Sequence, residues 1–122
     1  MADHFAARMA KVEIDLEAMK TTNLRILVEA DSGAAPGPES SMLKIKGTVI
    51  RQEINDLSRR ALGPYALPFV SEALDEGYNE PSIGPDYANA LASDYFNNRK
   101  LSIFAGSNEI QRGIISKTKL DL

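Results

Sequence analysis

The chain has 122 residues, of which 43% are hydrophobic and 25% are charged, with a net charge of −3 and no cysteine. This length has room for a single domain, residues 1–122, with one hydrophobic core. The acidic balance provides no basic surface for nucleic acid, and the lack of cysteine excludes disulfides and thiolate metal sites within the chain. No apolar run reaches the roughly 20 residues of a membrane span, so we expect neither a nucleic-acid nor a membrane partner. These features are compatible with a cytoplasmic protein.

A long first helix is predicted from about Ala2 to about Asp31. Apolar residues recur in steps of four and three, which is typical of a long helix packed against another helix. This stripe comprises Phe5, Met9, Val12, Leu16, Met19, Ile26 and Ala30, with Asn23 in the remaining slot. A second apolar face comprises Ile14, Leu24, Leu27 and Val28. At 1.5 Å per residue this helix would be about 45 Å long, which indicates neighbours outside this chain.

The chain starts inside this amphipathic helix, without the apolar core of a signal peptide. We therefore interpret Met1 as a start introduced by truncation of a longer protein. The alternative is a natural small helical protein.

A second helix is predicted to follow the break at residues 32–38, where two prolines prevent the first helix from continuing. It should start between Pro38 and Ser41 and stop at Gly63, which is followed by proline. Its apolar stripe consists of Leu43, Ile50, Ile54, Leu57 and Ala61.

Residues 64–85 are less regular and predict one short helical turn followed by a loop rich in glycine and proline. Asp86 is predicted to cap a third helix. The apolar residues of that helix are Ala88, Leu91, Ala92, Tyr95 and Phe96. A last helix should run from Ser107 or Asn108 to about Lys117. No alternating strand pattern competes, so we predict an all-α fold, an antiparallel up-down four-helix bundle with two long and two shorter helices.

Residues 104–115, FAGSNEIQRGII, carry the strongest functional signal. Gly106 permits unusual backbone dihedrals and lets a ligand approach the main chain. Ser107 or Asn108 is predicted to cap the last helix, and Asn108 with Gln111 resembles a capping box. A helix start presents unpaired N–H groups and a partial positive charge, which favour a phosphate or another anion. Most capped helix starts bind nothing, so a purely structural cap is the alternative.

This segment closely resembles the Gly-Thr/Ser-x-Glu/Gln-Ile-Gln-Arg run that opens the last helix of acyl-CoA dehydrogenases. The likeness extends weakly upstream, through residues 59–63 at the end of the second helix and residues 98–104 before the motif. It implies an FAD-dependent oxidoreductase of fatty acid metabolism that converts acyl-CoA to trans-2-enoyl-CoA. It also implies that an N-terminal helical domain, a middle β domain and one further helix are absent from this chain, so the chain alone should be inactive.

The resemblance implies specific cofactor contacts. Gly106, Ser107 and Glu109 would contact FAD, while Arg60 and Gly63 would approach the adenosine end of a cofactor held mainly by a neighbouring subunit. Arg60 stands where the family often has glutamine, and a proline follows Gly63 where the family often has a second glycine. Alternatively, Arg60 is a solvated residue near a helix end, and Glu109 is only a first-turn acid favoured by the helix dipole.

Ala105 occupies the position of the catalytic glutamate in many acyl-CoA dehydrogenases. Its methyl group cannot accept the α-proton of the substrate, so no catalytic residue is predicted in this chain. The backbone N–H of Ala105 could still bind the thioester carbonyl. The base would come from a helix before Met1 or from a partner subunit, since neither Asp94 nor Glu109 is expected to reach the acyl Cα.

The resemblance further implies acyl-CoA as substrate and self-association as a dimer or tetramer, or assembly with a second dehydrogenase subunit. The alternative from another functional class is a non-catalytic helical module that serves only oligomerisation. The flavin-facing motif separates the two, because packing alone would not require it. No spacing typical of a metal site or a nucleophilic triad occurs, and His4 is expected at the surface. The sequence leaves open the acyl-chain specificity and the choice between homo- and hetero-oligomer.

Overall fold

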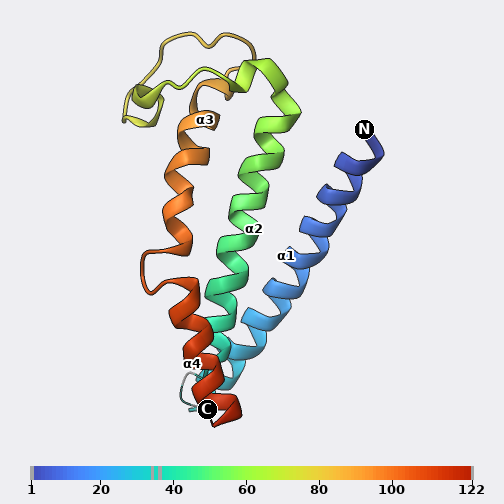
Figure 1. Cartoon of the computed structure of the whole chain (residues 1–122), viewed down its shortest axis with the longest axis vertical. Helices are drawn as coiled ribbons and strands as arrows, with labels where there is room; N and C mark the ends of the chain where they lie inside the picture. Colours follow the sequence, from blue (N-terminus) through green and yellow to red (C-terminus); the bar gives the residue numbers. More distant parts are fainter. Residues whose placement is uncertain (1, 34, 36, 122) are drawn as a thin grey trace. The chain divides into compact units, whose positions relative to one another are not determined.

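The computed structural model describes residues 2–33, 35 and 37–121, and this part of the chain is helical without any strand. The four α-helices are α1 (Ala2–Asp31), α2 (Glu39–Leu62), α3 (Ala88–Asn97) and α4 (Asn108–Leu120) (Figure 1). Three short 3-10 helices lie in the connections, namely η1 (Gly63–Ala66), η2 (Ser71–Leu74) and η3 (Asn98–Ser102). The predicted all-α fold class is therefore confirmed. Met1 and two residues of the predicted break, Ala34 and Pro36, lie outside the described residues.

The predicted helix boundaries agree closely with the structure where backbone-breaking residues set them. α1 has the predicted bounds, and α2 ends at the residue before Gly63, whose φ of +56° lies in the left-handed region that glycine adopts easily. α4 runs three residues beyond the predicted end, to Leu120, and stops at Asp121 in a left-handed conformation.

The prediction that Asp86 caps the third helix is wrong. The residue at the cap is Tyr87, which makes no side-chain capping hydrogen bond. The backbone N–H of Ala88 instead donates to the carbonyl oxygen of Pro85 at 2.8 Å. Asp86 therefore lies inside this turn, one residue too early to serve as the N-cap.

The chain divides into two compact units, the first formed by residues 1–50 and 101–122 and the second by residues 51–100. In the first unit α4 runs antiparallel to the first half of α2. Lys44 Nζ lies 2.9 Å from Asn108 Oδ1 near the start of α4, and Lys119 Nζ lies 2.9 Å from Glu39 Oε1 near its end. These two contacts fix both ends of α4 against α2.

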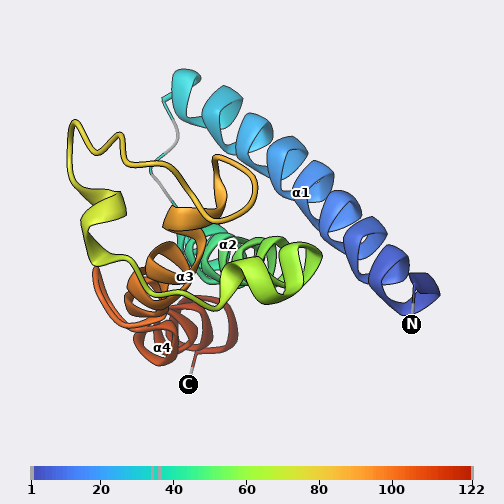
Figure 2. The ribbon, with the colours of Figure 1, turned by 90° about the horizontal axis from the view of Figure 1, so that it is seen from above.

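The long helix α1 packs through one half-buried stripe, and no described side chain of α1 is fully buried. Five residues of the predicted stripe are half-buried: Phe5, Val12, Leu16, Met19 and Ile26. A Cβ at Gly47 of α2 would lie 3.2 Å from Met19 Cε, so this glycine permits a close approach between α1 and α2. Within this unit, no other helix lies against the opposite side of α1 (Figure 2).

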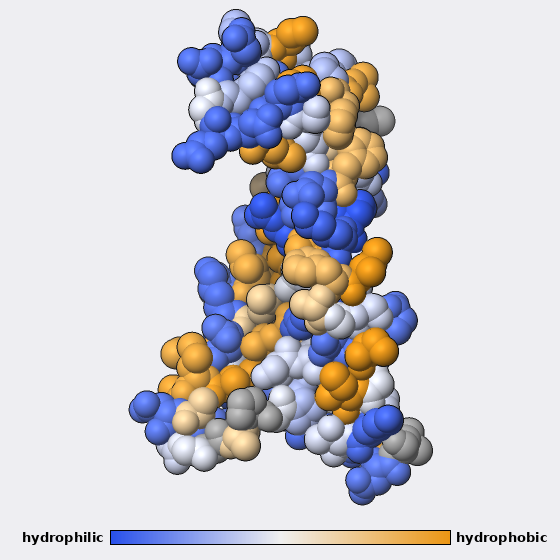
Figure 3. Space-filling view, turned by 90° about the vertical axis from the view of Figure 1, so that its left-hand side faces the viewer, coloured by the Kyte–Doolittle hydropathy of each residue, from blue (hydrophilic) through white to orange (hydrophobic). Residues whose placement is uncertain are grey.

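The second predicted apolar face of α1 is uncovered. Ile14, Leu24, Leu27 and Val28 are all between 58% and 69% exposed. Exposed hydrophobic side chains also occur elsewhere in the chain, and Figure 3 shows them on one face as separate groups between hydrophilic ones. Among the residues that the structure describes, no helix combines the length and apolarity needed to cross a bilayer.

The second unit packs α3 antiparallel to the end of α2 around a paired polar cluster. Asn55 Nδ2 donates to Asp94 Oδ2 at 2.8 Å, and Asn98 Nδ2 donates to Asn55 Oδ1 at 2.9 Å and to Asp94 Oδ1 at 3.1 Å. Arg51 forms an ion pair with Asp94 at 3.5 Å. Every buried side-chain nitrogen and oxygen in the described residues has a hydrogen-bond partner. The cluster is therefore satisfied, which a buried polar group requires.

Candidate functional site

The segment between η3 and α4 contains two consecutive residues in the left-handed region. Ala105 has a φ of +55° and Gly106 a φ of +81°. This conformation suits glycine, whereas a residue with a Cβ adopts it at a cost of about 1–2 kcal/mol. Both residues are exposed, so the main chain of this turn is accessible to a ligand.

Ser107 is the N-cap of α4, which is one of the two predicted possibilities. Its Oγ accepts a hydrogen bond from the backbone N–H of Ile110 at 3.4 Å. The carboxylate of Glu109 is hydrogen-bonded by its own backbone N–H and by the Ser107 hydroxyl, and these bonds lower its pKa from the ordinary value of 4.5. The positive charges of Arg112 and Lys44 act in the same direction. The first turn of α4 is therefore an environment that stabilises negative charge.

The capping box predicted for Asn108 and Gln111 is wrong. Because Ser107 is the cap, the reciprocal residue of a box would be Ile110, which has no side-chain acceptor. The Nε2 of Gln111 donates instead to the carbonyl oxygen of Ala105 at 3.3 Å. The Gln111 side chain therefore links the first turn of α4 to the main chain of the preceding turn.

The side chain of Asn108 contacts α2 rather than its own helix start. Its Nδ2 donates to Thr48 Oγ1 at 3.0 Å, and its Oδ1 accepts from Lys44 Nζ at 2.9 Å. Thr48 Oγ1 also lies 2.8 Å from the carbonyl oxygen of Ile45. The Thr48 hydroxyl can therefore donate its single proton to the Ile45 carbonyl oxygen while its own oxygen accepts a hydrogen bond from Asn108. Only the spacing of Lys44 and Thr48 on one helix face was visible in the sequence, and that spacing does not identify the partner.

A comparison with protein-family models identifies the family of this chain. The model described as acyl-CoA dehydrogenase, C-terminal domain, matches residues 2–120. The chain belongs to the acyl-CoA dehydrogenase family. No curated protein and no solved structure matches the chain significantly. The all-helical architecture of the described residues is consistent with the C-terminal helical domain of this family.

The turn of this acyl-CoA dehydrogenase domain combines an exposed main chain with a glycine that has no room for a side chain. A Cβ on Gly106 would lie 2.6 Å from Gln111 Nε2, so only glycine leaves the hydrogen bond from Gln111 to Ala105 undisturbed. Ser107 and Glu109 add a hydroxyl and a carboxylate beside the helix start. The exposed main chain and these two side chains provide both donors and acceptors for a ligand.

Arg60 and Gly63 of this domain belong to the other compact unit. Arg60 Nε donates to Asp56 Oδ2 at 2.7 Å in an exposed pair on α2. The neighbouring Arg59 lies over the ring of Tyr95, with 4.3 Å between the guanidinium carbon and the ring centroid, a contact that the sequence did not predict. Arg99 also stacks on Tyr95, at 4.4 Å. Two guanidinium groups thus lie over the Tyr95 ring, an arrangement favoured by the ring quadrupole.

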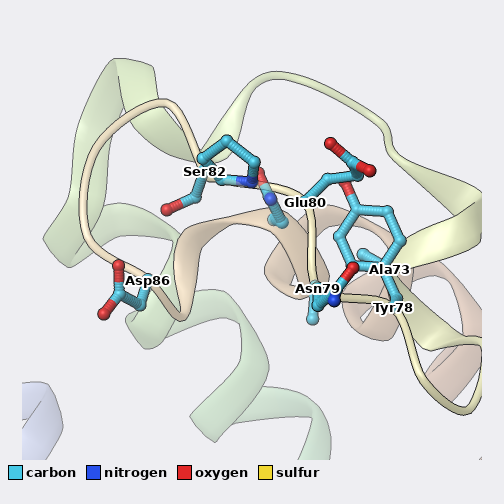
Figure 4. A pocket seen from close by; sticks show the side chains of 9 residues that line it. Ala73, Tyr78, Asn79, Glu80, Ser82 and Asp86 are labelled. Atoms are coloured by element: carbon cyan, nitrogen blue, oxygen red, sulfur yellow. The ribbon is translucent and has the colours of Figure 1, made fainter.

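A polar pocket of about 350 Å³ lies in the second unit. Its lining comprises Ala73, Tyr78, Asn79, Glu80, Pro81, Ser82, Asp86, Asn89 and Ala90. Figure 4 shows Ser82 and Asp86 on one side and Tyr78 with Glu80 on the other. This lining contains two carboxylates and no cationic side chain, so its charge disfavours a phosphate group. None of the predicted cofactor contacts lines it. Within the described residues, no group of three histidine, cysteine or acidic side chains could hold a metal ion.

Proposed function

We propose that the chain is the C-terminal part of an FAD-dependent acyl-CoA dehydrogenase subunit that converts acyl-CoA to trans-2-enoyl-CoA. The observation that carries this proposal is the family match over residues 2–120, supported by an exposed glycine turn ahead of a capped helix. The bound flavin would supply the oxidant, taking the hydrogen and the electron pair that leave the acyl Cβ. The protein contributes binding, orientation and electrostatics.

In this proposal the turn and the first helical turn of α4 bind the cofactor. Gly106 allows the main chain to approach FAD closely, while Ser107 and Glu109 contact it. The N–H groups at the start of α4 and the nearby charge of Lys44 favour an electron-rich ligand edge. This role is compatible with the hydrogen bonds inside the turn, because the exposed backbone of residues 105 and 106 remains accessible.

Arg60 and Gly63 approach the adenosine end of a cofactor held mainly by a neighbouring subunit. The ion pair between Arg60 and Asp56 does not oppose this role, because an exposed pair contributes only about 0–1 kcal/mol. A phosphate could therefore compete with Asp56 for the guanidinium. The exposed Leu24 and Leu27 on α1 support the accompanying proposal that the subunit forms a dimer or tetramer, or pairs with a second dehydrogenase subunit.

Ala105 supplies orientation but no proton acceptor. Its backbone N–H binds the thioester carbonyl of acyl-CoA and stabilises the negative charge that develops there as the α-proton leaves. The proton goes to a base outside this chain. Asp94 is an unsuitable substitute, because its two oxygens already accept hydrogen bonds from Asn55 and Asn98.

The decisive experiment compares the complete subunit that carries this chain with the 122-residue chain alone. The complete subunit should purify with a flavin absorbance band at about 450 nm and reduce a dye with acyl-CoA, whereas the chain alone should be inactive and bind FAD weakly. A complete subunit that stays colourless after incubation with FAD would overturn the proposal. The chain would then be an association module, the function that the exposed apolar face of α1 favours.

The placement of the base has its own test, in flavin-loaded Asp94→Asn and Glu109→Gln subunits. Both should keep the rate of dye reduction within about one order of magnitude of the original, since a missing general base typically costs 10²–10⁴-fold or more. A larger loss in either variant with FAD still bound would place the base in this chain.

A further inference from the structure

Asn108 attaches the start of α4 to α2 through both ends of its side-chain amide. The donor end contacts Thr48 and the acceptor end contacts Lys44, two residues one turn apart on α2. Asn108 and Thr48 are only 7% and 9% exposed. Because the two ends of the amide have different partners, both the position and the rotation of the side chain are fixed.

This attachment completes a set of three side-chain contacts around one helix start. Ser107 binds the helix's own N–H group, Gln111 binds the carbonyl of the preceding turn, and Asn108 binds the neighbouring helix. The first two contacts are local and would move together with α4. The contact of Asn108 joins the start of α4 to α2, and it therefore helps to position Ala105 and Gly106 with respect to that helix.

Asn108 also holds a positive charge, the ammonium group of Lys44, beside the start of α4. Lys44 is held within 2.9 Å of the amide oxygen at the first residue of α4. Its ammonium group therefore adds to the partial positive charge of the helix start. Removal of Asn108 would release this cation as well as the turn.

We propose that Asn108 is a positioning residue for the flavin-facing turn, acting through Thr48 and Lys44 of α2 without contacting the ligand itself. This inference rests on the proposed function of the turn. It goes beyond that function because it assigns the placement of the cofactor-binding N–H groups to a residue buried against another helix. One short motif therefore contains two kinds of residue. Exposed residues face the ligand, and one buried residue, Asn108, fixes their position.

The test measures FAD binding by the complete subunit in four variants. Asn108→Ala removes both hydrogen bonds, Thr48→Val removes one with little change of shape, and Asn108→Asp keeps an acceptor for Lys44. The matched control is Asn55→Ala, because Asn55 is also a buried asparagine of a paired cluster, but in the other compact unit. Thermal unfolding is recorded for every variant, so that a loss of binding can be compared with a loss of stability.

Asn108→Ala should raise the Kd for FAD about tenfold, the effect of losing one to two buried hydrogen bonds. Thr48→Val should weaken binding less, Asn108→Asp should restore part of it, and Asn55→Ala should lower the unfolding temperature without changing the Kd. If Asn108→Ala does not fold, Thr48→Val and Asn108→Asp still give the ordered series. An unchanged Kd in all three Asn108 and Thr48 variants would overturn the proposal. So would an equal rise in Asn55→Ala, because the effect would then follow stability alone.

Hydrogen exchange of the 122-residue chain separates failure of this inference from failure of the proposed function. If the parent protein binds no flavin at all, the proposed function fails, yet the attachment can still be judged. The backbone amides of Ile110 and Gln111 should exchange faster in Asn108→Ala than in Asn55→Ala. Equal exchange in the two variants would show that Asn108 does not position the turn.

Discussion

Gln111 donates a hydrogen bond from Nε2 to the carbonyl oxygen of Ala105 at 3.3 Å, across the glycine that separates the turn from the helix cap. A Cβ placed on that glycine, Gly106, would lie 2.6 Å from the same nitrogen. The hydrogen bond of Gln111 therefore requires that residue 106 has no side chain. Changing either should affect the other.

Gly106→Ala should lower the free energy of unfolding by about 2 kcal/mol, from the left-handed φ and the displaced Gln111 side chain. Gln111→Ala alone should cost about 1 kcal/mol. The double variant should lose less than the sum, because both changes remove the same hydrogen bond. Urea denaturation measures all three. Gly113→Ala is the control, since a Cβ there meets open space within α4, and it should stabilise by about 0.5–1 kcal/mol. Strict additivity of the first two changes would contradict the coupling.

Asp94→Ala should destabilise the chain by about 1–3 kcal/mol, because it removes the acceptor of the buried Asn55 amide and one of the two acceptors of the Asn98 amide. Asp86→Ala is the matched control. Asp86 is exposed and does not cap α3, so its removal should change stability by no more than about 0.5 kcal/mol. Chemical denaturation distinguishes the two, and a larger loss for Asp86→Ala would restore a capping role.

The contact between Glu39 and Lys119 should make stability depend on pH in the acid range. The hydrogen bond from Lys119 and then that from the backbone N–H of Glu39 lower the pKa of this carboxyl from 4.5. A group whose pKa is lowered in the folded state stabilises the fold above its unfolded pKa, and the effect is lost as the pH falls through the folded value. Melting temperatures measured from pH 6 downward should therefore fall less in Glu39→Gln, relative to its own value at about pH 6, than in the original chain. Lys119→Met should flatten the profile similarly, and added salt should reduce the difference because the pair is exposed.

Ser107→Ala in the complete subunit should weaken FAD binding about fivefold, corresponding to about 1 kcal/mol for one hydrogen bond. Glu109→Ala combined with it should weaken binding further. Thr118→Val provides the control, because Thr118 bonds only the carbonyl of Ile114 near the other end of α4. Titration followed by flavin fluorescence gives the affinities. Unchanged binding in the Ser107 and Glu109 double variant would remove both residues from the site.

Self-association should depend on the uncovered apolar face of α1. Leu24→Glu together with Leu27→Glu places charge on adjacent turns of that face and should convert a dimer or tetramer to smaller species. Lys11→Glu, an exposed change elsewhere on α1, should leave the oligomer intact. Light scattering at micromolar concentration reports the mass. A monomer for the unchanged chain would contradict the prediction at once.

The helix boundaries were predictable because local chemistry sets them. The period of the apolar residues and the left-handed glycines at 33 and 63 define α1 and α2 without reference to distant residues. The capping predictions for Asp86 and Asn108 failed for the opposite reason. Several polar residues near each helix start could serve as the cap, and the choice depended on contacts such as that of Asn108 with Thr48, sixty residues away in sequence.

The candidate site was predictable only as far as it is a continuous segment. Unusual backbone dihedrals at Gly106 and a cap at Ser107 or Asn108 follow from residues 106–110 alone, and the structure has a left-handed Gly106 with Ser107 as the cap. The stacking of Arg59 on Tyr95 joins two helices and left no signature in either sequence segment. The flavin contacts of Ser107, Glu109, Arg60 and Gly63 stay predictions.

Because Ala105 already has a left-handed conformation, a change of its side chain can alter the chemistry of this position without altering the fold of the turn. A residue with a Cβ already occupies the region that normally favours glycine, and its side chain is exposed. Exchanging the methyl group for a longer unbranched side chain therefore adds no new backbone strain. A side chain with a carboxylate can therefore replace the methyl group at residue 105 while the turn, the helix cap and the attachment to α2 persist. The same exchange one residue later, at Gly106, would disturb the turn itself.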